Sequence, residues 1–158
     1  MNRYIRHGIA KLEEVIPAVL TNWSSPSHLR KKLLLQGYKV GTGSLRLVTF
    51  AKAYKDGKIC CVECGLEASF FSIDSFQALT EKPSIHLNLY GIRNGQEVLF
   101  THDHILARAL GGIDDLSNTQ VMCSPCNNKK SRMENKLATQ MRLEKDNQKG
   151  LKVDQKQE

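Results

Sequence analysis

Residues 101–130 read THDHILARALGGIDDLSNTQVMCSPCNNKK, and this stretch decides both the fold and the chemistry that the chain can support. It begins with a His-Asp-His cluster and ends with a Cys-x2-Cys pair, Cys123 and Cys126. A matching pair, Cys61 and Cys64, lies upstream. Because thiolates, imidazoles and carboxylates are common protein ligands of metal ions, the stretch predicts a metal-dependent site.

The two cysteine pairs predict a closed tetrahedral zinc site, because four thiolates fill every coordination position of the ion. Such a site is structural: it joins two distant segments and contributes free energy to folding. The alternative is two unrelated pairs. The sequence shows no apolar leader and no membrane-length apolar run, so we expect no membrane contact and a cytoplasmic location. A reducing compartment favours metal over disulfides. Cys60 is left over, and we interpret it as a small buried residue or a bystander thiol.

The same stretch resembles the HNH endonuclease family, also called the ββα-metal or His-Me finger family. The family pattern runs Asp-His-Ile, a loop with Gly-Gly, Leu-x-Asn, and then Cys-x-x-Cys-Asn-x-x-Lys. The matching residues are Asp103-His104-Ile105, Gly111-Gly112, Leu116-Ser117-Asn118 and the run from Cys123 to Lys130. The resemblance is strong over about 30 residues, and it implies a nuclease that acts on DNA.

The resemblance also implies roles for individual residues. His104 would be the general base, and Asp103 and Asn127 would hold a catalytic divalent ion, Mg²⁺ or Mn²⁺. Asn118 would hydrogen-bond the backbone and keep His104 oriented. Lys130, about one helical turn after Asn127, would contact the phosphate.

One local feature conflicts with simple strand geometry. In a regular strand His102 and His104 share one face and Asp103 faces the other. The resemblance implies that the strand ends here and that the chain bends, so that Asp103 and His104 reach one site. His102 remains either a strand residue or a metal or phosphate contact. His86 is better interpreted as an ordinary strand residue.

The charge of the chain is unevenly distributed. The net charge of +7 divides into +8 for residues 1–58, −5 for residues 59–128 and +4 for residues 129–158. Basic flanks around an acidic centre suit a polyanionic partner, and the resemblance implies that this partner is DNA. The candidate phosphate contacts are Arg30, Lys31, Lys32, Arg46 and, in the motif loop, Arg108. A solvated basic face is the alternative for all of them.

The fold class expected is α+β, with three parts. Residues 1–57 are predicted to be a basic helical region that contacts DNA. Residues 58–135 are predicted to form a zinc-stapled ββα-metal core, with strands at 98–104 and 119–122 and a helix from about residue 125. Residues 136–158 are predicted to be a charged tail, helical at first and frayed after Gly150.

Periodicity supplies the details of these parts. Apolar residues from Ile5 to Val19 follow a helical spacing that Pro17 should end or kink. A second helix is predicted over residues 28–36, ending at Gly37, and a third after Ser44 as its cap. The last two helices fit either a helix-turn-helix or a plain packed pair. A strand over residues 85–89 and a turn at residues 94–95 precede the core strands.

The function predicted is a DNA endonuclease that hydrolyses phosphodiester bonds with one catalytic metal ion. A zinc-stabilised nucleic-acid-binding module without catalysis is the alternative. A third reading is a structural accessory of a phage or mobile-element machine in which the site is vestigial. Association as a homodimer or in a larger phage or mobile-element assembly is left open. The target sequence, the number of strands cut and the biological role are also open.

Overall fold

The computed structural model describes residues 4–26, 29, 31–76 and 84–154, with side chains described as far as residue 146. The fold is α+β, as expected. A five-stranded antiparallel sheet has the order β1-β4-β5-β6-β7. Its strands are β1 (Tyr4–Ala10), β4 (Ala68–Phe76), β5 (Ile85–Arg93), β6 (Gln96–His104) and β7 (Thr119–Cys123).

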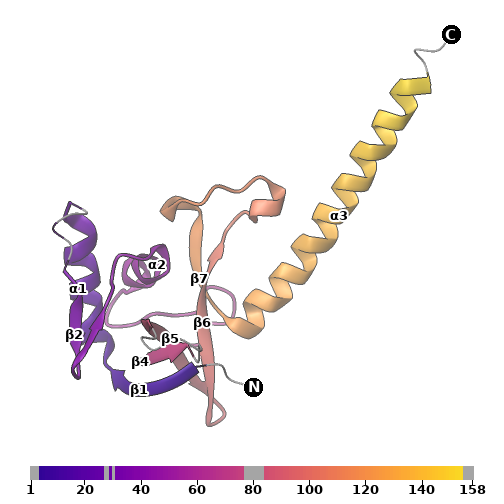
Figure 1. Ribbon diagram of the computed structural model, residues 1–158. Helices are drawn as coiled ribbons and strands as arrows, with labels where there is room; N and C mark the ends of the chain where they lie inside the picture. The colour runs from indigo at the N-terminus through magenta and orange to yellow at the C-terminus, as the bar shows by residue number, and fades with distance from the viewer. Residues whose placement is uncertain (1–3, 27–28, 30, 77–83, 155–158) are drawn as a thin grey trace.

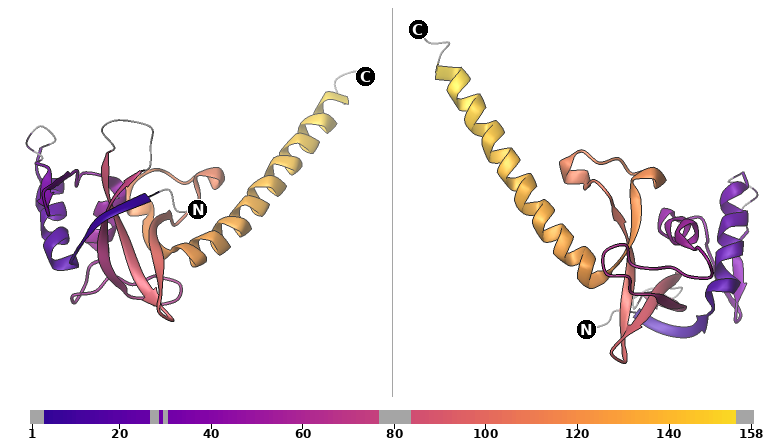
Figure 2. Two further views of the ribbon diagram at one scale, coloured as in Figure 1. Left: turned by 60° about the horizontal axis from the view of Figure 1, so that its bottom comes forward. Right: turned by 180° about the vertical axis from the view of Figure 1, so that it is seen from behind.

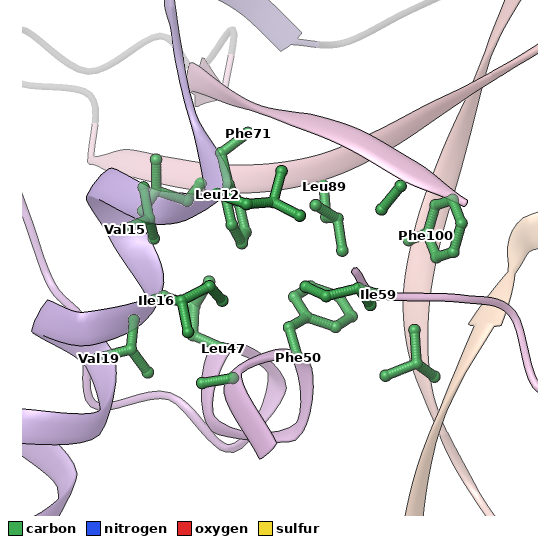
Figure 3. Close-up of a cluster of buried hydrophobic side chains, with 14 of the residues drawn as sticks. Leu12, Val15, Ile16, Val19, Leu47, Phe50, Ile59, Phe71, Leu89 and Phe100 are labelled. Carbon is green, nitrogen blue, oxygen red and sulfur yellow. The ribbon is translucent and has the colours of Figure 1, made fainter. Parts of the chain in front are cut away.

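Two helices, α1 (Leu12–Ser24) and α2 (Leu45–Ala53), pack together against the sheet, and Figure 3 shows the core between them. The predicted cap is confirmed, because the Ser44 hydroxyl accepts a hydrogen bond from the Leu47 N–H at 3.3 Å. Buried side chains of both helices meet apolar residues of β4, β5 and β6 there. The labelled members are Leu12, Val15, Ile16, Val19, Leu47, Phe50, Ile59, Phe71, Leu89 and Phe100.

The helix predicted over residues 28–36 is wrong. Within the described residues this segment contains β2 (Leu33–Leu35), which pairs with β3 (Tyr38–Val40) in a small hairpin. Gln36 and Gly37 both have positive φ, 48° and 86°, as a tight two-residue hairpin turn requires. Gly37 therefore turns a hairpin instead of ending a helix, and the described residues of this segment form no helix-turn-helix; residues 28 and 30 of the predicted helix lie outside them.

The first helix predicted is half correct. Residues from Leu12 onward are helical and bury the expected face, but the preceding segment is strand β1. Ile5 and Ile9 on β1 are about half exposed, so the buried helical face begins only with α1. Pro17 lies inside α1 and does not end it. Because β1 pairs with β4, the N-terminal region contributes one strand to the sheet of the following region, while β2 and β3 form a separate two-stranded sheet.

A polar network on the other face of the sheet ties β1 to its neighbours. The Arg6 guanidinium donates two hydrogen bonds of 2.8 Å to the Glu97 carboxylate and one of 2.7 Å to the Ser72 hydroxyl. The buried Asp74 carboxylate accepts hydrogen bonds from Ser72 and from Asn88. The network fixes the start of β6 against the rest of the sheet.

Strand β6 belongs to two pairings in succession. Its first residues pair with β5 through the predicted turn, in which Asn94 and Gly95 both have positive φ. From Phe100 onward β6 pairs instead with β7, and the ladder continues to its last residue, His104. The strand thus carries the structure from the N-terminal core into the unit that holds the sequence motif.

Helix α3 (Ser124–Asp154) follows β7 directly and completes the predicted ββα arrangement. Strands β6 and β7, the loop between them and α3 are called the ββα unit below. The first turns of α3 contact β6 and β7, and the rest projects away from the molecule, as Figures 1 and 2 show. The helix passes Gly150, where the sequence predicted fraying. Among the described residues, none of the helices combines the length and the apolar character needed to cross a membrane.

Candidate active site and cysteine centre

The first cysteine pair lies in a tight knuckle. The Gly65 N–H donates to the Cys61 carbonyl and the Cys61 N–H donates to the Leu66 carbonyl, both at 2.9 Å. Gly65 has a φ of 70°, a conformation that glycine adopts without steric cost. The Val62 N–H donates to the Val121 carbonyl at 3.0 Å and so joins the knuckle to β7.

The second pair comes from the junction of β7 and α3, where Cys123 ends the strand and Cys126 lies in the first helical turn. The four sulfur atoms of the two pairs all lie within 4.8 Å of one another. The Cys64 and Cys123 sulfurs are 3.7 Å apart. A tetrahedral ion with about 2.3 Å metal–sulfur bonds needs sulfurs about 3.8 Å apart, so the set fits a four-coordinate metal ion.

The surroundings of the cluster favour thiolate formation at one position. The Leu66 backbone N–H, followed by contacts with the other thiols, lowers the pKa of Cys64 to about 6, although burial opposes this. Burial raises the pKa of Cys123 and Cys126. The Arg93 guanidinium donates to the Cys64 sulfur at 2.8 Å and supplies positive charge beside it. Cys60 is exposed and lies outside the cluster, so the bystander interpretation fits better than a buried one.

Asp103 faces α3 from strand β6 and is buried. One of its carboxylate oxygens lies 2.9 Å from the Lys130 ammonium and accepts a hydrogen bond of 2.8 Å from the Gln120 amide. Gln120 is the residue opposite Asp103 in the β6–β7 ladder. The Asp103 carboxylate on β6 is therefore held by one residue from β7 and one from α3.

Lys130 connects the helix to the end of β6. Its ammonium donates hydrogen bonds of 2.6 Å to the His104 carbonyl and to the Glu134 carboxylate, in addition to its contact with Asp103. Burial lowers the pKa of Lys130, but the bonds to Glu134 and Asp103 outweigh burial and leave the pKa raised. The ammonium is thus charged and internally bonded, whereas the sequence predicted a contact with substrate phosphate.

Asn127 lies on the same side of the unit as Asp103. Its amide nitrogen donates to the Thr101 hydroxyl at 2.8 Å, and its oxygen accepts from Ser131 at 3.3 Å. Thr101 and Asp103 are two residues apart and share the face of β6 that α3 covers. Asp103 and Asn127, the two predicted metal ligands, therefore both lie at this face. Their oxygens are the hard ligands that suit a Mg²⁺ ion retaining several waters.

His104 lies on the opposite face of β6. The bend predicted at Asp103-His104 does not occur within the strand, because His104 still pairs with Thr119 at the end of the ladder. Alternation therefore holds, and His102 shares the His104 face with ring centroids 6.0 Å apart. Burial, followed by the neighbouring His104 and Arg46, lowers the pKa of His102.

The loop between β6 and β7 closes beside His104. It contains the short helices η2 (Arg108–Leu110) and η3 (Leu116–Asn118). Asp114, which precedes η3, has a carboxylate oxygen 2.9 Å from the His104 ring atom Nε2. Gly112 lies so near the chain that a Cβ there would meet the Leu106 carbonyl oxygen at 1.8 Å.

Asn118 holds this loop together. Its side-chain oxygen accepts from the Leu106 N–H at 2.9 Å. Its amide nitrogen donates to the Leu106 carbonyl at 3.0 Å and to the Ile113 carbonyl at 2.8 Å. The backbone contact expected of Asn118 is thus present. It is made with Leu106, two residues after His104, and with Ile113, the residue before Asp114, without a direct bond to the His104 ring.

The predicted DNA contacts differ in their placement. Lys31, Lys32 and Arg108 are exposed, and Arg30 lies outside the described residues. Arg46 is turned inward: its guanidinium donates hydrogen bonds of 2.8 Å to the Asn88 side chain and to the Leu87 carbonyl on β5. Burial lowers the pKa of Arg46. This internal position does not favour the predicted phosphate contact for Arg46.

Four polar residues of the site were not singled out from the sequence. They are the partners of the motif residues: Thr101, Asp114, Gln120 and Glu134. Glu134 follows Lys130 by four residues, a spacing that brings side chains together on a helix and could have indicated the pair. His86 lies on β5 and bonds to the Ser84 hydroxyl, as expected of an ordinary strand residue. Arg46 bonds to β5, and its charge also acts on His102.

Comparison with known proteins bears on the motif-bearing unit alone. The family model described as HNH endonuclease matches residues 93–142, from the end of β5 into α3. No curated protein and no solved structure matched the chain. Residues 93–142 of this chain therefore match the HNH endonuclease family, and the match supports a nuclease type of function.

Proposed function

We propose that the protein is a metal-dependent DNA endonuclease. In this proposal His104 takes the proton from the attacking water, and Asp103 and Asn127 hold one Mg²⁺ or Mn²⁺ ion. The observation that carries the proposal is the coincidence of two facts. The segment that matches the HNH family folds as β6, β7 and α3, and it gathers the motif residues around the end of β6.

The placement of Asp103 and His104 supports a shared substrate. They are the last two residues of β6, so their Cα atoms are about 3.8 Å apart although their side chains leave opposite faces. A phosphate over the end of the strand would be reached from both faces. His104 is mostly buried, with a side chain 19% exposed, which keeps its ring in one place while leaving an approach for water.

The other residues of the unit have supporting roles in this proposal. The divalent ion would neutralise charge on the phosphate and stabilise the leaving oxygen. Lys130 holds the Asp103 carboxylate and the His104 carbonyl at fixed positions. Asn118 holds the loop that faces His104. A zinc ion in the four-cysteine centre would fix the start of α3, and with it Asn127, against β7.

DNA contact is proposed for the exposed cations Lys31, Lys32 and Arg108. Arg30 belongs with them by sequence alone. Exposed lysines and arginines release counterions when they meet phosphates, so their removal should weaken binding more at low salt than at high salt. A homodimer, and assembly with a phage or mobile-element machine, remain predictions from the sequence.

The test is cleavage of supercoiled plasmid by the purified protein with bound zinc. Mg²⁺ is compared with buffer that lacks divalent ions, because EDTA would also strip the cysteine centre. We expect Mg²⁺-dependent nicking or linearisation. We expect His104→Ala to lower its rate by about 10²–10⁴-fold, because a general base contributes about that factor.

His86→Ala is the matched control, since His86 lies on β5 and bonds to the Ser84 hydroxyl away from the motif. Its cleavage rate should equal that of the unmodified protein. Full activity of His104→Ala would exclude His104 as the base. Tight DNA binding without cleavage, unaffected by Mg²⁺ and by Asp103→Ala, would instead support the non-catalytic zinc-stabilised binding module.

A further inference from the structure

The contact between Asp114 and His104 joins the motif loop to the end of β6. The Asp114 carboxylate oxygen Oδ1 lies 2.9 Å from His104 Nε2. The His104 side chain is 19% exposed and the Asp114 side chain is 60% exposed. Across the described part of the chain, Asp114 has no second hydrogen-bond or ion-pair partner, although its charge also acts on the nearby His102.

The chemistry of the two groups fixes which ring nitrogen carries the proton. An ionised carboxylate can only accept hydrogen bonds. Nε2 of His104 must therefore donate to Asp114, and in the neutral ring the proton resides on Nε2. The other nitrogen, Nδ1, is then left with a lone pair. Only an unprotonated ring nitrogen can accept a proton from water.

We propose that Asp114 is a positioning residue for His104, which it holds in the tautomer and orientation that leave Nδ1 free to take the proton of the attacking water. This inference rests on the proposed nuclease function. In the proton transfer, Nδ1 gains the proton of the water, the ring becomes a cation, and the hydroxide oxygen forms the bond to phosphorus as the 3′ oxygen leaves.

The loop holds Asp114 in place by bonds that do not involve its own side chain. Asn118 donates to the carbonyl of Ile113, the residue before Asp114. Asp115, the residue after it, accepts from the Ser117 N–H at 2.8 Å and from the Ser117 hydroxyl at 2.6 Å. Removing the Asp114 carboxylate should therefore leave the loop in its present conformation.

The adjacent carboxylates of Asp114 and Asp115 thus bond to different parts of the structure. Asp115 stabilises the loop itself, and Asp114 reaches across to the strand. Because the loop does not depend on the Asp114 side chain, two variants at this position can be compared without disturbing the loop. Asp114→Glu keeps a carboxylate that can only accept, one methylene farther from the backbone, whereas Asp114→Ala removes the acceptor.

The first measurement detects the tautomer without any cleavage. Long-range ¹⁵N–¹H spectra are recorded at an alkaline pH at which imidazole is neutral, and the His104 signals are identified by their loss in His104→Ala. We expect the ring proton on Nε2 in the unmodified protein and in Asp114→Glu, whose carboxylate can only accept. We expect a mixture of tautomers in Asp114→Ala. A proton on Nδ1, or an unchanged ring in Asp114→Ala, would overturn the proposal.

The second measurement is single-turnover nicking with Mg²⁺. Loss of a partner that orients a functional histidine commonly costs on the order of tenfold or more, so Asp114→Ala should be about tenfold slower. Its Kd for DNA should be unchanged, and Asp114→Glu should retain more of the rate than Asp114→Ala does. In a His104→Ala background, Asp114→Ala should cause no further loss, because Asp114 acts through the ring.

The outcomes separate the two levels of inference. If the unmodified protein nicks DNA but Asp114→Ala nicks equally fast, the positioning role is wrong and the nuclease stands. A further loss in the double variant would assign Asp114 a role apart from His104 and would also overturn the proposal. If the unmodified protein does not nick at all, the nuclease function fails and the catalytic role of Asp114 fails with it, even where the ring spectra show the contact.

Discussion

The N-terminal core and the ββα unit are stabilised in different ways. The first draws on apolar side chains of β4, β5 and the helices α1 and α2, many of them fully buried. The second contributes few residues to that core. From β6 onward its buried apolar residues are Phe100, Val121, Met122, Cys123 and Ala138.

Helix α3 makes the contrast sharper. It is the longest element of the chain, yet Met133, Leu137, Met141 and Leu143 are about half exposed on it. A unit with so little apolar burial gains little from the hydrophobic effect. The difference teaches that the part carrying the motif relies on its four-cysteine centre and on hydrogen bonds for its shape, whereas the other part relies on packing.

Disruption of the four-cysteine centre should have the largest effect. If that centre holds the proposed structural zinc ion, the ion contributes on the order of 10 kcal/mol to folding, more than packing can replace in the ββα unit. Cys123→Ser, or a strong chelator, should therefore abolish amide-exchange protection in β7 and the first turns of α3. Protection in β4 should persist. Cys60→Ser is the control, because Cys60 is exposed and outside the cluster. Intact protection of β7 in Cys123→Ser would refute the dependence on metal.

The packed core should respond next. Phe71 on β4 is fully buried and lies against Phe50 with ring centroids 6.3 Å apart. Phe71→Ala should lower the free energy of unfolding by about 3–5 kcal/mol. Phe76→Ala on the same strand should cost less than about 1 kcal/mol, because Phe76 is 38% exposed. Denaturant midpoints measure both, and equal losses for the two variants would contradict a core centred on Phe71.

The smallest expected effect probes the junction of the two regions. The buried Thr49 hydroxyl on α2 lies 2.9 Å from the Thr119 hydroxyl on β7. Thr49→Val keeps the shape and removes this hydrogen bond together with the one from the same hydroxyl to the Leu45 carbonyl, so it should cost about 1 kcal/mol. Thr49→Ser keeps the hydroxyl and serves as the control. Thermal unfolding measures the difference, and a Thr49→Val protein as stable as the unmodified one would show that the bond does not join the regions energetically.

The sequence predicted the ββα unit well because its signals are local or follow fixed spacings. The turn at Asn94-Gly95, the strands on either side of the motif loop and the helix after Cys123 all formed where expected. The two cysteine pairs met as their spacing indicated. Each of these features depends on residues close together in sequence or on one shared ligand.

The N-terminal region was harder to predict because its apolar pattern fits two structures. Leu33, Leu34 and Leu35 form a run without a clear period, and the Gln36-Gly37 turn decided for a hairpin. In β1, Ile5 and Ile9 have helical spacing but pair across to β4. Tertiary pairing overrode local propensity at both places.

The partners within the site could not be predicted from spacing for a different reason. Asp114 meets His104 only because the loop folds back on Leu106 and Asn118 fixes it there. Gln120 meets Asp103 because of the ladder register between β6 and β7. Such contacts depend on the whole backbone path, which no single motif specifies.

Because β6 pairs with both β5 and β7, the segment that matches the HNH family, residues 93–142, cannot be moved to another protein as an independent unit. Residues 93–142 begin at the last residue of β5, so an excised fragment would carry the first half of β6 as a bare sheet edge and would uncover Phe100. The boundary drawn by family likeness and the boundary drawn by hydrogen bonds differ. Anyone grafting this unit onto another scaffold must take β5 along, or supply a strand in its place.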